Sequence, residues 1–199
     1  MLPIWIIYIA VAMRLGGSLA YLRATLSGRA KPDPVSWLLW GIIPIIAFIA
    51  EVQAGVGLAA IITLAVGISP LIVFCAAMYK NRYSFKLRGF NLICVIMAVV
   101  GIAIWTVTSD PFLAITLMIL ADIASTLPTI IKTIKNPKSE FAASYLVSSL
   151  SMLLALFAID QWSFAALAYP AYIMAINLFI FLLASRKKDQ PKRRQRVSI

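Results

Sequence analysis

The chain of 199 residues is 62% hydrophobic and only 13% charged, with a formal net charge of +11. About a quarter of the residues of an ordinary soluble domain are charged, so this low charged fraction, together with the mean hydropathy of +0.95, excludes that class of protein. A mostly apolar stretch of about 17 to 25 residues can cross a bilayer as a helix. We predict an all-α integral membrane protein with seven transmembrane helices, over Leu2–Leu22, Val35–Ala50, Val56–Met78, Phe90–Val107, Phe112–Ile131, Phe141–Ile159 and Ser163–Ser185.

The basic residues predict how these helices are oriented. Seventeen of the 18 Lys and Arg residues fall in three alternate connectors, 23–31, 80–88 and 132–138, and in the tail 186–199. The three connectors on the opposite side hold none. Because Lys and Arg mark the cytoplasmic side, we predict the N-terminus outside and the C-terminus in the cytoplasm. This pattern explains the net charge without nucleic acid, and the basic tail can also contact anionic lipid headgroups.

A shift of 108 residues aligns two parts of the chain. It places "RLGGSL" at 14–19 on "DIASTL" at 122–127 and Trp37 on Tyr145, and the basic connectors coincide. With one helix between them, the two halves have the same orientation and form parallel repeats, related by an axis along the membrane normal. The prediction is a first three-helix repeat over 1–80, a connector and linker helix over 81–109, a second three-helix repeat over 110–185 and a cytoplasmic tail over 186–199.

Arg14 interrupts the first apolar stretch, and an arginine alone at the centre of a bilayer costs a few kcal/mol. The repeat places Arg14 at the same depth as Asp122. We therefore predict that the two side chains pair across the central interface, where each charge compensates the other. Such a pair is either a structural lock or part of a polar pathway. The alternative is that Arg14 extends toward a polar cavity and Asp122 caps a local backbone defect, without mutual contact.

The stretch "ADIASTLPTIIKTIKNPKSE" at 121–140 resembles the PQ-loop signature, in which a helix ending in Leu-Pro-Gln leads through a short basic connector to a helix that begins with a serine. Thr129 stands where the signature has glutamine, and Ala20 and Tyr21 replace both motif residues in the first repeat. The 3+1+3 arrangement resembles that of the SWEET sugar facilitators and of bacterial vitamin-B3-type transporters. The chain thus resembles a divergent bacterial member of this superfamily.

The resemblance implies roles for particular residues. In SWEET-like transporters, polar residues on the third helix of each repeat and bulky residues on the second line the substrate pocket. By this resemblance Ser69 and its equivalent Asn177 line a transport path, together with Trp40 and its equivalent Ser148. Alternatively, Ser69 and Asn177 make hydrogen bonds between helices. The tryptophans at 37 and 40 can also be interfacial belt residues, which we favour for Trp37.

Prolines in the bundle helices of related proteins are thought to assist bending. Pro44 and Pro128 are therefore hinge candidates, since a proline inside a helix removes a backbone hydrogen bond. A static kink is the alternative.

The function expected from these features is a facilitator or carrier that moves a small polar metabolite by alternating access. The alternative is a PQ-loop-fold receptor or interaction protein that binds a ligand or peptide end without transport. The sequence has no histidine and no motif with paired acids or metal-ligand spacing, so we expect no enzyme activity, cofactor or metal site. We expect a bacterial inner-membrane location, and a homo-oligomer is compatible with the sequence.

Overall fold

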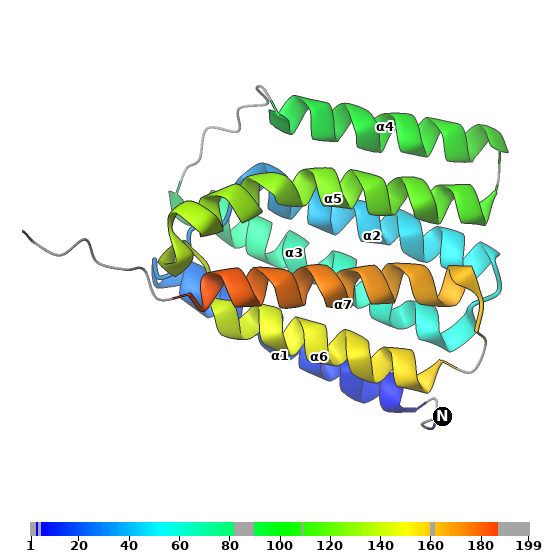
Figure 1. The fold of residues 1–199 in the computed structure, drawn as a ribbon, viewed down its shortest axis with the longest axis horizontal. Helices are drawn as coiled ribbons and strands as arrows, with labels where there is room; N and C mark the ends of the chain where they lie inside the picture. Colours follow the sequence, from blue (N-terminus) through cyan, green and yellow to red (C-terminus); the bar gives the residue numbers. More distant parts are fainter. Residues whose placement is uncertain (1–2, 4, 82–89, 109, 160–161, 187–199) are drawn as a thin grey trace, which may run out of the picture.

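The computed structural model describes residues 3, 5–81, 90–108, 110–159 and 162–186. Within these ranges the chain forms α-helices that run alongside one another, two short 3-10 turns and no strand (Figure 1). The predicted connector at 82–89 and the basic tail beyond Arg186 lie outside the described residues. The helices are α1 (Ile6–Leu26), α2 (Pro34–Gln53), α3 (Ala60–Asn81), α4 (Phe90–Thr108), α5 (Pro111–Lys135), α6 (Ala142–Ala158) and α7 (Phe164–Ala184), with 3-10 turns η1 (Gly57–Ala59) and η2 (Pro137–Ser139).

Several helices have the length and composition of membrane spans. Among the described residues α1, α2, α3 with its preceding 3-10 turn, α5 and α7 are long and apolar enough to cross a bilayer. α6 is an apolar helix of 17 residues, slightly shorter than this limit. The prediction of an all-helical, membrane-embedded protein is confirmed at this level.

The helix ends follow local hydrogen bonding as well as hydropathy. Asp33 and Asp110 accept hydrogen bonds from the first free backbone N–H groups of α2 and α5, and a proline follows each of them at the first helical position. At the end of α1, Gly28 adopts a φ of 77°, which glycine tolerates without a Cβ clash. The backbone N–H of Arg29 then bonds to the carbonyl of Ala24 and closes the helix. The helix therefore ends at Leu26, four residues later than apolarity alone predicts, and it also begins four residues later, at Ile6.

The packing of the helices follows the same scheme in both halves of the chain. In the first half α3 packs against α1 and α2, and in the second half α7 packs against α5 and α6. Between the halves α1 packs on α6 and α5 packs on α2. Exchanging the first three helices with the last three leaves these pairings unchanged. α4 lies at the outside of the bundle beside α5 (Figure 1).

Two buried apolar clusters fill the interior. The larger is mainly aliphatic and includes Ile7, Ile43 and Met118. The smaller lies near the C-terminal end of α1 and contains the aromatic residues Tyr21, Trp37 and Tyr145. Residues of both clusters border a cavity into which several polar side chains converge.

Candidate functional site

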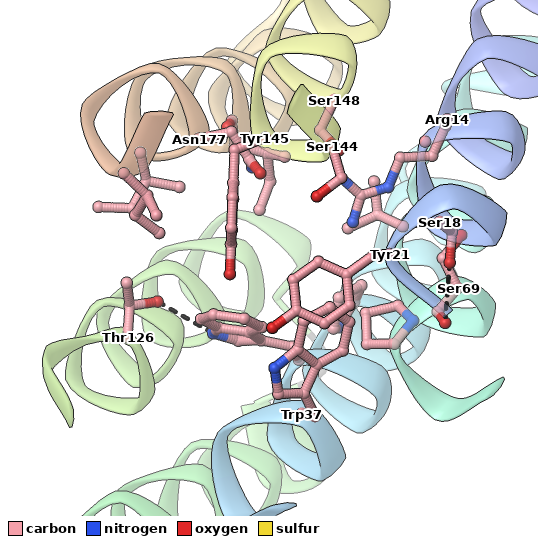
Figure 2. A pocket seen from close by; sticks show the side chains of 18 of the residues that line it. Arg14, Ser18, Tyr21, Trp37, Ser69, Thr126, Ser144, Tyr145, Ser148 and Asn177 are labelled. Atoms are coloured by element: carbon pink, nitrogen blue, oxygen red, sulfur yellow. Dashed lines mark hydrogen bonds between the residues drawn. The ribbon is translucent and has the colours of Figure 1, made fainter. Parts of the chain in front are cut away.

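The cavity lies among α1, α2, α3, α5, α6 and α7, so both halves of the chain contribute to its wall (Figure 2). Its volume, as space open to the centres of water molecules, is about 50 Å³, which is enough to hold water. The lining residues are Arg14, Gly17, Ser18, Tyr21, Trp37, Trp40, Pro44, Val66, Ser69, Pro70, Asp122, Thr126, Ser144, Tyr145, Ser148, Ile173, Ile176, Asn177 and Ile180.

The structure brings together every residue predicted for the transport path. Of the two hinge candidates, Pro44 also lines the cavity, whereas Pro128 lies within α5 away from it. The predicted path residues at the cavity are Arg14, Asp122, Ser69, Asn177, Trp40 and Ser148.

The cavity wall also respects the 108-residue shift. Several lining residues occur in pairs that this shift relates, with one member in each half of the chain. The two members of a pair differ in chemistry: an arginine in the first half corresponds to an aspartate in the second, and a tryptophan corresponds to a serine. The five pairs are Arg14 with Asp122, Ser18 with Thr126, Trp37 with Tyr145, Trp40 with Ser148, and Ser69 with Asn177.

The predicted direct ion pair between Arg14 and Asp122 is not formed. Both side chains are buried, at 9% and 3% exposure, and their charges interact, but no nitrogen of Arg14 lies within 4 Å of a carboxylate oxygen among the described residues. Asp122 Oδ2 instead accepts a hydrogen bond of 2.6 Å from the Tyr172 hydroxyl. The structure fits the part of the alternative in which Arg14 extends toward a polar cavity, but the Asp122 carboxylate binds Tyr172 and caps no backbone defect among the described residues. The prediction was wrong because equal depth in two helices does not fix the distance across the space between them.

Arg14 has no hydrogen-bond partner among the residues that the structure describes, and its Nε atom is fully buried. In Figure 2 its side chain reaches from α1 toward Ser144 at the edge of the cavity. The Ser144 hydroxyl donates to the Phe141 carbonyl instead. A buried guanidinium in this situation loses hydration without gaining a hydrogen bond or a direct ion pair, which is costly inside a membrane.

Asp122 is held by a small network on α5. The Thr126 hydroxyl donates to the Asp122 carbonyl at 2.8 Å and accepts from the Trp40 indole Nε1 at 3.0 Å (Figure 2). Trp40 of α2 is thereby fixed against α5 of the other half. Since Tyr172 of α7 binds the carboxylate, three helices position this side of the cavity.

Ser69 and Asn177 use their donors within their own helices. The Ser69 hydroxyl donates to the Ala65 carbonyl and the Asn177 amide nitrogen to the Ile173 carbonyl. These are not the hydrogen bonds between helices that the alternative predicted. One bond between helices does reach this position, from the Ser18 hydroxyl to the Ser69 carbonyl at 3.2 Å. The Asn177 side-chain oxygen has no hydrogen-bond partner among the described residues, so it is available to an occupant of the cavity.

An aromatic group closes the cavity at the C-terminal end of α1. The rings of Tyr21 and Trp37 lie 4.3 Å apart between centroids, and Tyr145 meets Tyr21 edge-on at 6.1 Å. Trp37 is 6% exposed, so the interpretation of this residue as an interfacial belt residue is wrong. Its alignment with Tyr145 was the signal that both face the centre. The sequence analysis noted Tyr21 only as a departure from the PQ-loop signature and did not predict its place at the cavity.

Below the aromatic group lies a buried carboxylate. Glu140, just before α6, accepts hydrogen bonds from the hydroxyls of Tyr21 at 2.6 Å and Tyr145 at 2.8 Å. It also forms an ion pair with Lys132 of α5. Because Tyr21 belongs to the first half and Glu140 to the second, this cluster joins the halves at one end of the cavity.

Comparisons with models of known protein families, with curated proteins and with solved structures find no match. The resemblance to the PQ-loop superfamily stays a prediction, based on the residues quoted above.

Proposed function

We propose that the protein is a membrane carrier that moves a small polar metabolite through the central cavity by alternating access. The observation that carries this proposal is the cavity wall, where five pairs of residues related by the 108-residue shift face one space. In carriers built from parallel repeats, the substrate site lies near the repeat interface at the middle of the bilayer. Movement of one half against the other would open such a cavity to either side.

For the arrangement in the membrane, we propose that α4 and α6 also cross the bilayer, giving seven spans in a 3+1+3 order. The C-terminal ends of α1, α3, α5 and α7 lie at the same end of the bundle (Figure 1). Arg23, Lys80 and Lys132 belong to the last turns of three of these helices. The positive-inside rule favours this end as the cytoplasmic one. A bacterial inner membrane is part of this proposal.

The interface between the halves is suited to rearrangement. Side-chain hydrogen bonds cross it, such as Ser36 to the Ser125 carbonyl at 2.9 Å, and bonds of this kind contribute about 1 kcal/mol each. Pro44 and Pro128 lie in α2 and α5, which pack on each other across this interface. Each proline removes one backbone hydrogen bond from its helix. We propose both as bending points.

A cross-link between the halves tests the mechanism. A Cβ atom at Gly17 of α1 would lie 3.4 Å from the Cβ of Val147 of α6, close to the spacing in a disulfide. We would prepare Gly17→Cys with Val147→Cys, after replacing Cys75 and Cys94 by serine, and reconstitute the protein in liposomes. Uptake of radiolabelled amino acids, sugars, nucleosides and vitamins would be measured before and after oxidation.

We expect uptake of one solute class, its loss on oxidation and its return on reduction. The two single-cysteine variants are the matched controls and should transport under both conditions. Undiminished uptake by fully cross-linked protein would contradict alternating access. A solute that binds tightly but never enters the liposomes would contradict the carrier and favour the receptor alternative.

A further inference from the structure

The cavity contains one positive charge that no ion pair or hydrogen bond of the described residues compensates. Arg14 is about nine-tenths buried, extends to the cavity edge, and has neither a hydrogen bond nor an ion pair among the described residues. Its guanidinium carries five N–H donors in a planar fork that matches a carboxylate. An acceptor that enters the cavity can recover free energy lost by burying this group, most effectively one with a negative charge.

The same cavity contains one negative charge. Asp122 is 3% exposed and lines the wall, with Oδ2 held by Tyr172. Its Oδ1 has no hydrogen bond to any residue in the described part of the chain. Arg14 and Asp122 are the only charged side chains among the described lining residues, and they do not neutralise each other by direct contact. The wall of this cavity therefore carries two opposite charges that are not in direct contact.

Other groups of the cavity wall narrow the chemical class of the occupant further. The indoles of Trp37 and Trp40 provide an apolar surface beside the charges, and Asn177 provides an amide oxygen without a partner among the described residues. A small anion leaves the Asp122 charge unmatched, a small cation leaves Arg14 unmatched, and a neutral solute leaves both.

We propose that the cavity binds a small zwitterion, with its carboxylate on the Arg14 guanidinium and its ammonium group facing Asp122. This rests on the proposed function in that the bound zwitterion is the solute carried. Tyr172 holds Oδ2 of Asp122, and we assign Oδ1, which has no hydrogen bond to a described residue, to the ligand's ammonium group. The apolar part of the solute lies against the indoles.

Alanine, propionate and ethylamine form a matched set of probes for the charge requirement. Propionate is alanine without its ammonium group, and ethylamine is alanine without its carboxylate. Purified protein in detergent would be titrated calorimetrically with the twenty amino acids, glycine betaine, propionate, ethylamine and glucose. We expect one or more zwitterions to bind and to raise the unfolding temperature, and propionate and ethylamine to bind about tenfold more weakly or worse. The proposal is overturned if no zwitterion binds, or if propionate, ethylamine or glucose binds as tightly.

Variants assign the contacts. Arg14→Gln and Asp122→Asn should each weaken zwitterion binding about tenfold or more. Arg23→Gln removes an exposed arginine from the same helix away from the cavity, and it should bind normally. Arg14→Lys keeps the positive charge but lacks the planar N–H donors of the guanidinium. It replaces Arg14→Gln in the titration if Arg14→Gln does not fold. Normal affinity in both Asp122→Asn and the folded Arg14 variant overturns the proposal.

These measurements test the zwitterion site and the carrier activity separately. Zwitterion binding in detergent without uptake into liposomes would refute the carrier and leave the binding site intact. Uptake of a neutral sugar, with no zwitterion binding, would support the carrier and refute the inference.

Discussion

The two halves of the molecule place different chemistry at equivalent positions of the cavity. The first half contributes a cation and two indoles, from Arg14, Trp37 and Trp40, whereas the second contributes an anion and smaller polar groups, from Asp122 and Ser148. The shared positions follow from the matching order and packing of the helices. The different side chains give the cavity two unlike walls, so that it can hold the two ends of an asymmetric solute in a defined orientation.

The helix contacts within the halves differ in a similar way. In the first half α2 and α3 approach closely at Gly41 and Gly67. At the equivalent positions the second half has Ser149 and Ala175, and the Ser149 hydroxyl donates to the Met174 carbonyl of α7 at 3.0 Å. The first half therefore relies on the absence of side chains, and the second on a hydrogen bond. Substitutions at such positions should affect the two halves unequally.

The largest effect is expected at Glu140, whose equivalent in the first half is Pro32. Glu140→Ala removes the acceptor for Tyr21 and Tyr145 and breaks the ion pair with Lys132. We expect a loss of about 3 kcal/mol in unfolding free energy, because each of the two hydrogen bonds to a charged acceptor contributes about 1.5 kcal/mol. Guanidinium unfolding of the protein in detergent measures this.

Glu140→Gln is the matched control, because it keeps an acceptor of the same shape without the charge. Its stability should lie between that of the unmodified protein and that of Glu140→Ala. If Glu140→Ala unfolds at the same guanidinium concentration as the unmodified protein, the cluster at this end does not hold the halves together.

A smaller effect is expected at the contact of α2 with α3. A Cβ at Gly67 would lie 2.9 Å from the Gly41 backbone carbonyl oxygen and 2.8 Å from Ile45 Cγ1, so the helices must move apart. Gly67→Ala should cost about 1 to 3 kcal/mol, the usual range for overpacking. Thermal unfolding in detergent measures the change.

Gly16→Ala is the control for this substitution, since nothing lies within 4 Å of an added Cβ there. It should be neutral or slightly stabilising, because alanine is favoured over glycine inside a helix by about 1 kcal/mol. Equal unfolding temperatures for Gly67→Ala and Gly16→Ala would contradict the close approach of α2 and α3.

The sequence predicts the depth of residues along the helices better than their partners across the bundle. Apolar length locates the helices, and the 108-residue shift predicts that Ser69 and Asn177 lie at the same depth around one cavity. The partner of Asp122 could not be predicted in this way. It depends on the rotation of α5 about its axis and on the length of the Tyr172 side chain. The equivalent of Tyr172 in the first half is Leu64, an apolar residue that does not indicate a hydrogen bond at this position.

The same limit applies to the cluster around Glu140. Its carboxylate is reached by Tyr21 from a helix 119 residues away, and no repeat of the sequence relates the two. Glu140 was included in the motif stretch only as its last residue. The contact depends on how closely the halves approach at this end, which is a property of packing and not of hydropathy or spacing.

The smallest predicted effect compares two serines that the repeat relates. The Ser36 hydroxyl donates to the Ser125 carbonyl in the other half, whereas the Ser144 hydroxyl donates to the Phe141 carbonyl at the start of its own helix. Ser36→Ala should cost about 1 kcal/mol, because it leaves a buried bond between the halves unmade. Ser144→Ala should cost less, since the α6 backbone is held by its neighbours. Equal unfolding temperatures for the two variants would show that the hydrogen bond of Ser36 does not contribute to the union of the halves, which would then depend on apolar packing and on the Glu140 cluster.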